Sequence, residues 1–390
     1  MERPELTPGL MALVAVTTFA AASGIHYQTP MLGAIATEFG ADASAVGWVA
    51  TLSFAGFLAG ILFLAPLGDR VDKRKLIITQ HLAAIVALFA AAAAPGLASL
   101  AAAAFLIGVC ACYAQIIVPF VAELVRAEER GRAVGTVLTA LFLGILFARL
   151  TGGFVADHLG WRWMYLIAGC MLLALAPALL ARLPSSPPKT TLPYYALLAS
   201  IAQLMRQHAE MRRVFAVQFL LGICYGGFWA TIATMLLQQH GLGPTVAGLI
   251  GIPGAAGILI ARPAGRWMDL RGTGPIVTTG IALIISAYAV FAFGAWWAGA
   301  LALGAVLLDC GLRATMVANQ TSVNSLAADA GSRANTVFGV SVWTGNAAGA
   351  FLASTALARG GWLAVCAISV VAASVALGVQ LRSVRQLRRP

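Results

Sequence analysis

The chain has 390 residues, of which 60% are hydrophobic and only 10% are charged, and its formal net charge is +11. With a mean hydropathy of +0.88, it has too little polar surface for a water-soluble protein, so we expect an integral membrane protein. The basic residues lie in short links between apolar runs and at the C-terminus. This pattern is typical of membrane topology and anionic-lipid contact, and it argues against nucleic-acid binding.

Twelve apolar runs follow one another, each long enough to cross a bilayer as a helix. Most Arg and Lys residues lie in the links after the even-numbered runs and in the C-terminal tail. Because short basic links stay in the cytoplasm, we expect both termini to be cytoplasmic. The start of the chain lacks the basic region and cleavage site of a signal peptide. The runs span approximately 9–35, 46–67, 76–95, 98–123, 135–157, 162–182, 214–237, 245–264, 275–294, 297–323, 335–357 and 362–381.

The link Ala65–Lys75 is rich in charge and organises its neighbours. It reads A-P-L-G-D-R-V-D-K-R-K and joins the second and third apolar runs without a spacer. Gly265–Gly272 repeats it in the second part of the chain, with Asp269 lying 200 residues after Asp69. Likewise, Arg333 lies 201 residues after Arg132. The repeat predicts two parallel, pseudo-symmetric six-helix halves, an arrangement in which a central site is opened alternately to each side.

One longer link separates the halves. Residues 194–213 place apolar side chains such as Leu197 and Ile201 on one helical face, opposite Gln203 and Arg206. This pattern predicts an amphipathic helix along the cytoplasmic membrane surface, or alternatively a helix that binds a partner. The predicted units are an N-terminal half (1–183), a cytoplasmic linker (184–213), a C-terminal half (214–381) and a basic cytoplasmic tail (382–390).

The first link resembles a loop motif of the major facilitator superfamily, G-x-L-x-D-R-x-G-R-R. Ala65 and Asp72 stand where the family has Gly. The resemblance implies an all-α membrane protein with twelve transmembrane helices in the major facilitator fold, and loops that change conformation during transport. The residues expected to act in these loops are Asp69, Arg70, Lys73, Arg74, Arg132, Asp269 and Arg333.

The fifth run resembles a second motif of this family, G-x8-G-x3-G-P-x2-G-G, which is associated with antiporters. Gly135, Gly144 and Gly152 carry its spacing, whereas Ala148 and Arg149 replace the Gly-Pro pair. The chain as a whole resembles a bacterial branch of drug:proton antiporter-like exporters. Small residues at these positions allow close helix packing, but the departure weakens the antiporter assignment.

Charged residues inside apolar runs are costly in a bilayer, so each needs a partner or a function. Arg149 is a candidate ligand for a carboxylate or phosphate, or alternatively pairs with Asp309 or Glu123. Asp309 and Arg313 are four residues apart and are expected to face each other, either as a structural ion pair or as a proton-coupling pair. Glu123 is a candidate proton site or an interfacial partner of a nearby arginine.

Other polar and aromatic residues in the runs are candidates for substrate contact, with packing as the alternative. His26 and Gln28 lie in the first run, and His26 is also a candidate for protonation. Tyr225 and Trp229 lie beside the pair Gly226-Gly227, which permits a break in the seventh helix, whereas the spacing of Gly222 and Gly226 favours close helix contact. The tenth run adds Asn319 and Gln320.

We expect no catalytic activity, because the chain lacks a nucleotide-binding loop and a metal-protease motif. We expect no cofactor or bound metal, although scattered Cys and Met residues leave copper import as a distant alternative. The sequence therefore predicts a monomeric, multi-pass transporter of a bacterial inner membrane whose partners are a small-molecule substrate, protons and the lipid bilayer. Proton-coupled export of a small organic or amphipathic molecule is the first expectation, and uptake of an organic anion is the second.

Overall fold

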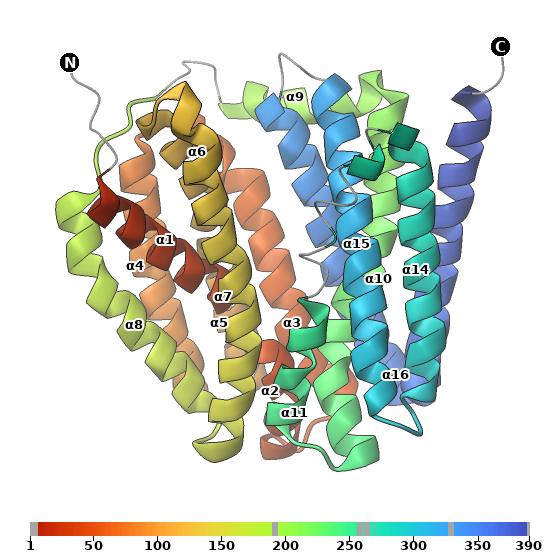
Figure 1. Ribbon diagram of the computed structural model, residues 1–390. Helices are drawn as coiled ribbons and strands as arrows, with labels where there is room; N and C mark the ends of the chain where they lie inside the picture. Colours follow the sequence, from red (N-terminus) through yellow and green to blue (C-terminus); the bar gives the residue numbers. More distant parts are fainter. Residues whose placement is uncertain are drawn as a thin grey trace.

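The computed structural model describes residues 7–188, 194–255, 260, 266–268, 270–326 and 331–387, and these residues form helices and short turns without a strand. The helices run side by side as a bundle (Figure 1). Ten helical segments of the described chain are long and apolar enough to cross a membrane. The expected membrane class is therefore confirmed.

The N-terminal half contains the first six crossings. Side-chain caps begin several helices, because their oxygens accept hydrogen bonds from otherwise unpaired backbone N–H groups: Thr7 accepts from Leu10, and Asp42 accepts from Ala45. The elements are α1 (Pro8–Gly24), α2 (Gln28–Glu38), α3 (Ala43–Ala59), the π-helical turn η1 (Gly60–Leu64), the 3₁₀ turn η2 (Pro66–Asp69), α4 (Lys73–Ala92), α5 (Leu97–Ala111), α6 (Tyr113–Leu124), the 3₁₀ turn η3 (Ala127–Glu129), α7 (Arg130–His158) and α8 (Trp161–Arg182).

The first crossing is broken between α1 and α2. The backbone leaves the regular helix at Ile25–Tyr27, and two side chains bind the carbonyls freed there: Gln28 Nε2 donates to Ile25, and Thr29 Oγ1 donates to His26. Non-helical backbone at membrane depth is tolerated where it is buried in protein, and His26 is only 3% exposed. The break therefore places a polar segment near the middle of the bundle.

The second part of the chain supplies the remaining crossings. Its last helix, α16, contains two of them, because Gly361 has a positive φ of 69° that divides it; Gly160 has a φ of 95° at the corresponding place before α8. The short α11 and α12 occupy the position of the eighth crossing, so the predicted twelve-helix fold is confirmed. The elements are α9 (Tyr194–Gln207), α10 (Ala209–His240), α11 (Pro244–Leu249), α12 (Gly251–Gly254), α14 (Thr273–Phe293), α15 (Gly299–Leu326) and α16 (Gly331–Leu387).

The seventh crossing differs from expectation, because α10 runs without a break through Gly226-Gly227. These glycines serve close packing instead. A Cβ on Gly226 would lie 2.2 Å from the carbonyl oxygen of Asn346 in α16. The close helix contact predicted for Gly222 and Gly226 is therefore confirmed, whereas the break that Gly226-Gly227 permits does not occur, because backbone contact with α16 holds this segment helical.

The two halves meet along two seams. In the α7–α11 seam, α7 packs against α11 and α12; in the α3–α16 seam, α3 packs against α16. The internal repeat of about 200 residues relates α7 to the first part of α16, and α3 to α11 and α12. The two seams are therefore built from corresponding helices. Both seams depend on glycine: a Cβ on Gly153 would lie 2.3 Å from Pro244 O, and a Cβ on Gly47 would lie 2.2 Å from Ser354 Cβ.

The start of α1, the end of α16 and the linker helix α9 lie at the same end of the bundle, whereas α2 and α11 lie toward the opposite end (Figure 1). The linker helix touches both halves. Tyr194 Oη donates to Phe63 O at 2.7 Å, and Leu204 packs in an apolar cluster with Met211 and Phe338. Part of the predicted amphipathic face therefore contacts protein.

Candidate functional site

Arg149 of α7 is buried at the boundary between the halves, with 4% of its surface exposed. Its Nη2 donates a hydrogen bond of 2.8 Å to Tyr225 Oη of α10, and its guanidinium carbon lies 3.4 Å from the Trp229 ring centroid. A guanidinium over an indole face is a favourable cation–π arrangement. The two aromatic residues predicted for substrate contact thus hold the predicted arginine.

No carboxylate of the described residues forms an ion pair with Arg149. The expected alternatives of a pair with Asp309 or Glu123 are therefore wrong for this conformation. Asp309 instead contacts Arg313, with Oδ1 and Nη2 separated by 4.0 Å. Asp309 is within electrostatic reach of Arg149 as well. Arg149 is therefore buried without a direct carboxylate partner among the described residues.

These charged groups share one cavity on the α7–α11 seam. The α7 helix supplies Arg149 together with Phe142, whose ring centroid is 5.0 Å from the Arg313 guanidinium carbon. Gly254 of α12 lies close to the carboxylate, since a Cβ on it would lie 2.9 Å from Asp309 Oδ2. The lining residues are Phe142, Ile145, Leu146, Arg149, Gly251, Gly254, Ala255, Asp309 and Arg313.

The cavity carries unused hydrogen-bonding capacity. Within the described part of the chain, Arg149 Nε, Arg313 Nε, Asp309 Oδ2 and Trp229 Nε1 are buried without a hydrogen-bond partner. A buried polar group without a partner costs about 1–3 kcal/mol. Such atoms clustered around one cavity indicate a place for a polar ligand or ordered water.

His26 lies near this cavity, at the break of the first crossing. Both Arg149 and Arg313 are within its electrostatic reach. Its ring centroid is 6.5 Å from those of Phe54 and Trp343, so a residue of α16 closes over it. Sequence reasoning missed Trp343, because the sequence does not distinguish it from the other aromatic residues of α16, such as Phe338 and Phe351.

Gln28 is fully buried beside the break, where it supports the backbone of Ile25. Its Oε1 has no partner among the described residues. Gln28 and His26 therefore form a polar segment at the break, which the N-terminal half contributes in addition to Arg149.

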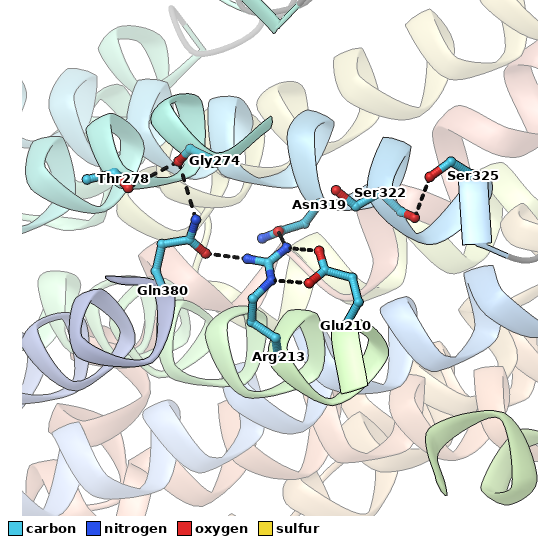
Figure 2. Close-up of polar contacts among 8 residues, drawn as sticks. All are labelled: Glu210, Arg213, Gly274, Thr278, Asn319, Ser322, Ser325 and Gln380. Carbon is cyan, nitrogen blue, oxygen red and sulfur yellow. Dashed lines mark hydrogen bonds and ion pairs between the residues drawn. The ribbon is translucent and has the colours of Figure 1, made fainter. Parts of the chain in front are cut away.

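Asn319 and Gln320 lie elsewhere. Asn319 accepts a 3.0 Å hydrogen bond from Arg213 Nη2, in the polar cluster shown in Figure 2, and Gln320 is exposed and donates to Asn335. Neither lines the cavity around Arg149.

The cluster in Figure 2 was missed from the sequence. Arg213 forms a bidentate pair with Glu210, at 2.6 and 2.8 Å, and donates to Gln380. Gln380 in turn donates to Gly274 O at the start of α14. One buried cation thus ties together the ends of α10, α14, α15 and α16.

The predicted loop residues form a corresponding cluster in the N-terminal half. Lys73 is 1% exposed and pairs with Glu123 at 3.2 Å. Ser186, from the segment after α8, also donates to Glu123 at 3.0 Å. Glu123 is therefore held at the end of α6 by the loop and the linker through Lys73 and Ser186, and its pairing with a nearby arginine stays a prediction.

Asp72 caps α4 and fastens the linker. Its carboxylate accepts hydrogen bonds from Ser185 Oγ at 2.6 Å and from the backbone N–H groups of Ser186 and Arg74. Partial burial acts to raise the pKa of Asp72, but these hydrogen bonds outweigh it and hold the pKa below its ordinary value. The loop is therefore anchored through a charged carboxylate.

The remaining loop residues are more loosely placed. Arg74 Nη2 donates to Leu180 O at 2.7 Å, Asp69 is half-buried, and Arg70 and Arg132 are exposed. Arg333 lies in α16, where the structure describes its backbone alone, and Asp269 lies outside the described residues. The described part of the chain holds no group of three or more His, Cys, Asp or Glu side chains placed to bind a metal ion.

Comparison with known proteins gives matches over most of the chain. The sequence model of the Major Facilitator Superfamily matches residues 14–354. The chain is 33% identical over 379 residues to uncharacterized transporter YgaY of Escherichia coli O157:H7, covering 97% of this chain and 96% of the relative. It is 34% identical over 381 residues to transporter SCO4007 of Streptomyces coelicolor, covering 97% and 88%.

Solved structures show the same architecture. The crystal structure of nucleoside transporter NupG superposes with a TM-score of 0.78 at 13% sequence identity, covering 97% of this chain and 99% of NupG. At this identity, the likeness concerns the fold.

Proposed function

Because this chain belongs to the Major Facilitator Superfamily, we propose that it is a secondary transporter that moves a small organic anion together with protons by alternating access. The two halves, residues 1–183 and 214–381, rock about the central cavity, and the 184–213 linker connects them. Both termini face the cytoplasm of a bacterial inner membrane. A monomer is sufficient, and the cavity performs transport rather than catalysis.

One observation carries this proposal: Arg149 is a buried cation without a carboxylate partner in the described chain. Its Nη2 and its guanidinium face are used by Tyr225 and Trp229, while its Nε remains unpaired. Arginine binds carboxylates and phosphates through a planar fork, and Arg313 lines the same cavity. Two arginines with one carboxylate favour an anionic cargo, and the neighbouring aromatic rings suit a cargo with an apolar part.

The charge of the cargo also decides how it is coupled to protons. An anion bound beside Asp309 adds negative charge and so favours proton binding at this carboxylate. By linkage, the proton then favours anion binding to the same extent. Anion and proton are therefore expected to bind together and move in the same direction, which makes uptake the direction driven by an inward proton gradient.

Export of an amphipathic cation in exchange for protons is the second candidate. The unpaired Oδ2 of Asp309 and the aromatic face of Trp229 favour it, because both attract cations. A cation would compete with a proton for Asp309, which leads to antiport. The resemblance to drug:proton exporters points the same way.

The two candidates differ in the sign of proton movement. We would reconstitute the purified protein in liposomes that contain a pH-sensitive dye, and add benzenesulfonate or benzyltrimethylammonium outside, two ions that cross a bare bilayer poorly. Acidification of the lumen on addition of benzenesulfonate supports anion–proton cotransport. Alkalinisation of the lumen by the cation supports antiport and contradicts the proposal.

Protein-free liposomes and Arg149→Gln liposomes are the controls. The variant removes the charge of Arg149 and is expected to abolish the response to benzenesulfonate. Benzenesulfonate-driven acidification that is unchanged in Arg149→Gln would show that Arg149 does not bind the anion.

A further inference from the structure

The charges around the cavity do not cancel. Arg149 enters from α7, and Asp309 and Arg313 enter from α15. Among the described residues, the elements packed against them add no further permanent charge to the lining: α12 contributes Gly251 and Gly254. Nearby titratable groups include His26, which is within electrostatic reach of both arginines, Tyr225, which accepts a hydrogen bond from Arg149, and Cys310, which follows Asp309 in α15.

From this arrangement, we propose that Asp309 determines which net charge the cargo can carry. With Asp309 ionised, Arg149, Arg313 and Asp309 together give the cavity a net charge of plus one, which matches a cargo with one negative charge. The inference rests on the proposed anion-transport function and specifies it. Asp309 acts as a specificity-determining residue in addition to any role in proton coupling.

The geometry places Asp309 in competition with cargo for the same arginines. Its contact with Arg313 is long, at 4.0 Å, and Oδ2 has no hydrogen-bond partner among the described residues. A monoanion can therefore enter between the arginines without breaking a tight ion pair, and the bound cavity becomes neutral. A dianion would leave one negative charge inside the protein, which is costly away from water.

A dianion has one other route into the cavity. A proton on Asp309 raises the cavity charge by one and restores neutrality with a dianion bound. At acidic pH, the wild-type cavity is thus expected to accept dianions as well, and a monoanion bound there is carried together with the proton on Asp309; at basic pH, the cavity accepts monoanions with Asp309 ionised. Replacing Asp309 by Asn imitates the protonated carboxyl at every pH.

The test compares two probes of nearly equal shape, monomethyl terephthalate with one negative charge and terephthalate with two. Their dissociation constants are measured by isothermal titration calorimetry on purified full-length protein at pH 8, where a free imidazole in water is uncharged. We expect wild type to prefer the monoanion on the order of tenfold or more, and Asp309→Asn to prefer the dianion.

Two further variants keep the test decisive. Arg313→Gln lowers the cavity charge to zero and is expected to weaken binding of both probes, so it reports on the charge count if Asp309→Asn does not fold. Asp42→Asn makes the same chemical change at the exposed cap of α3, where Asn also caps well, and is expected to keep the wild-type preference.

The outcomes separate the inference from the function on which it rests. If neither probe binds wild type, the anion-transport proposal fails. If wild type prefers the dianion, or Asp309→Asn keeps a preference for the monoanion, the anion site stands and the charge-setting role of Asp309 is overturned. Reversal of the preference in Asp309→Asn alone, and not in Asp42→Asn, supports it.

Discussion

The two seams between the halves are built from corresponding helices of the internal repeat, yet their chemistry differs. The α7–α11 seam contains Arg149, its cavity, and Asp157, which accepts a 2.8 Å hydrogen bond from the backbone N–H of Thr245 across the seam. The α3–α16 seam holds no charged pair among the described residues and is packed closely. The ring centroids of Phe57 and Trp343 are 4.3 Å apart, and Gly47 packs against Ser354. One seam therefore carries the charges to which we assign cargo binding in our proposal, and the other provides a packing surface.

The largest effect is expected from the charged seam. Arg149→Gln removes the unpaired cation and should lower the rate of benzenesulfonate-driven proton uptake about 100-fold, because a buried charge interaction is worth several kcal/mol at short range. This rate is measured with the purified protein reconstituted in liposomes. Arg130→Gln, an exposed arginine at the start of the same helix, is the matched control and should transport at the wild-type rate.

A polar cluster inside one half should behave differently from the seam. Arg213→Met removes the cation that joins α10, α15 and α16 (Figure 2) and should destabilise the protein on the order of 3 kcal/mol, because Glu210 loses its partner. Benzenesulfonate binding by the folded fraction should stay unchanged. Melting temperature in detergent and calorimetry measure the two effects, with the exposed neighbour Arg212→Met as control. Loss of affinity without loss of stability would place Arg213 in the transport site.

The apolar seam should be sensitive to volume rather than charge. Gly47→Val inserts a side chain where the first added atom would lie 2.2 Å from Ser354, and overpacking of this kind costs about 1–3 kcal/mol. The measurement is again the melting temperature. Gly9→Val is the control, because no atom lies within 4 Å of its added Cβ. Equal melting temperatures for the two variants would show that the α3–α16 seam is loosely packed.

The smallest effect is expected at the rim of the charged seam. Asp157→Ala removes the hydrogen bond to Thr245 and should weaken closure at this end by about 1 kcal/mol. Spin labels at His158 and Gln239, in a Cys170→Ser background, should then report a larger share of long distances. Asp157→Asn retains an acceptor oxygen and should show a smaller change. An unchanged distance distribution in Asp157→Ala would mean that the contact does not hold the seam.

The sequence was sufficient to predict the crossings and the two halves, because long apolar runs and a 200-residue repeat are local and periodic signals. It also identified Arg149, Asp309 and Arg313, since a charge in an apolar run stands out without knowledge of its partner. The partner itself was not predictable. Tyr225 lies 76 positions after Arg149 and meets it only through packing of α7 on α10.

The same limit explains the residues that were misplaced. Asn319 and Gln320 follow Asp309 along one helix, but Arg213 draws Asn319 into a separate cluster. The spacing of Gly222 and Gly226 predicted a close helix contact, but the sequence could not show that its partner is Asn346 of α16 or that the helix stays unbroken there. In each case, the deciding contact comes from a helix distant in sequence.

The most direct test of the central claim is a thermal-shift measurement on purified protein with organic acids and lipophilic cations. A ligand that binds the folded state raises the melting temperature by mass action. We predict that organic acids stabilise wild type and that Arg149→Ala abolishes this stabilisation. Stabilisation by cations alone, retained in Arg149→Ala, would contradict an anion site at Arg149.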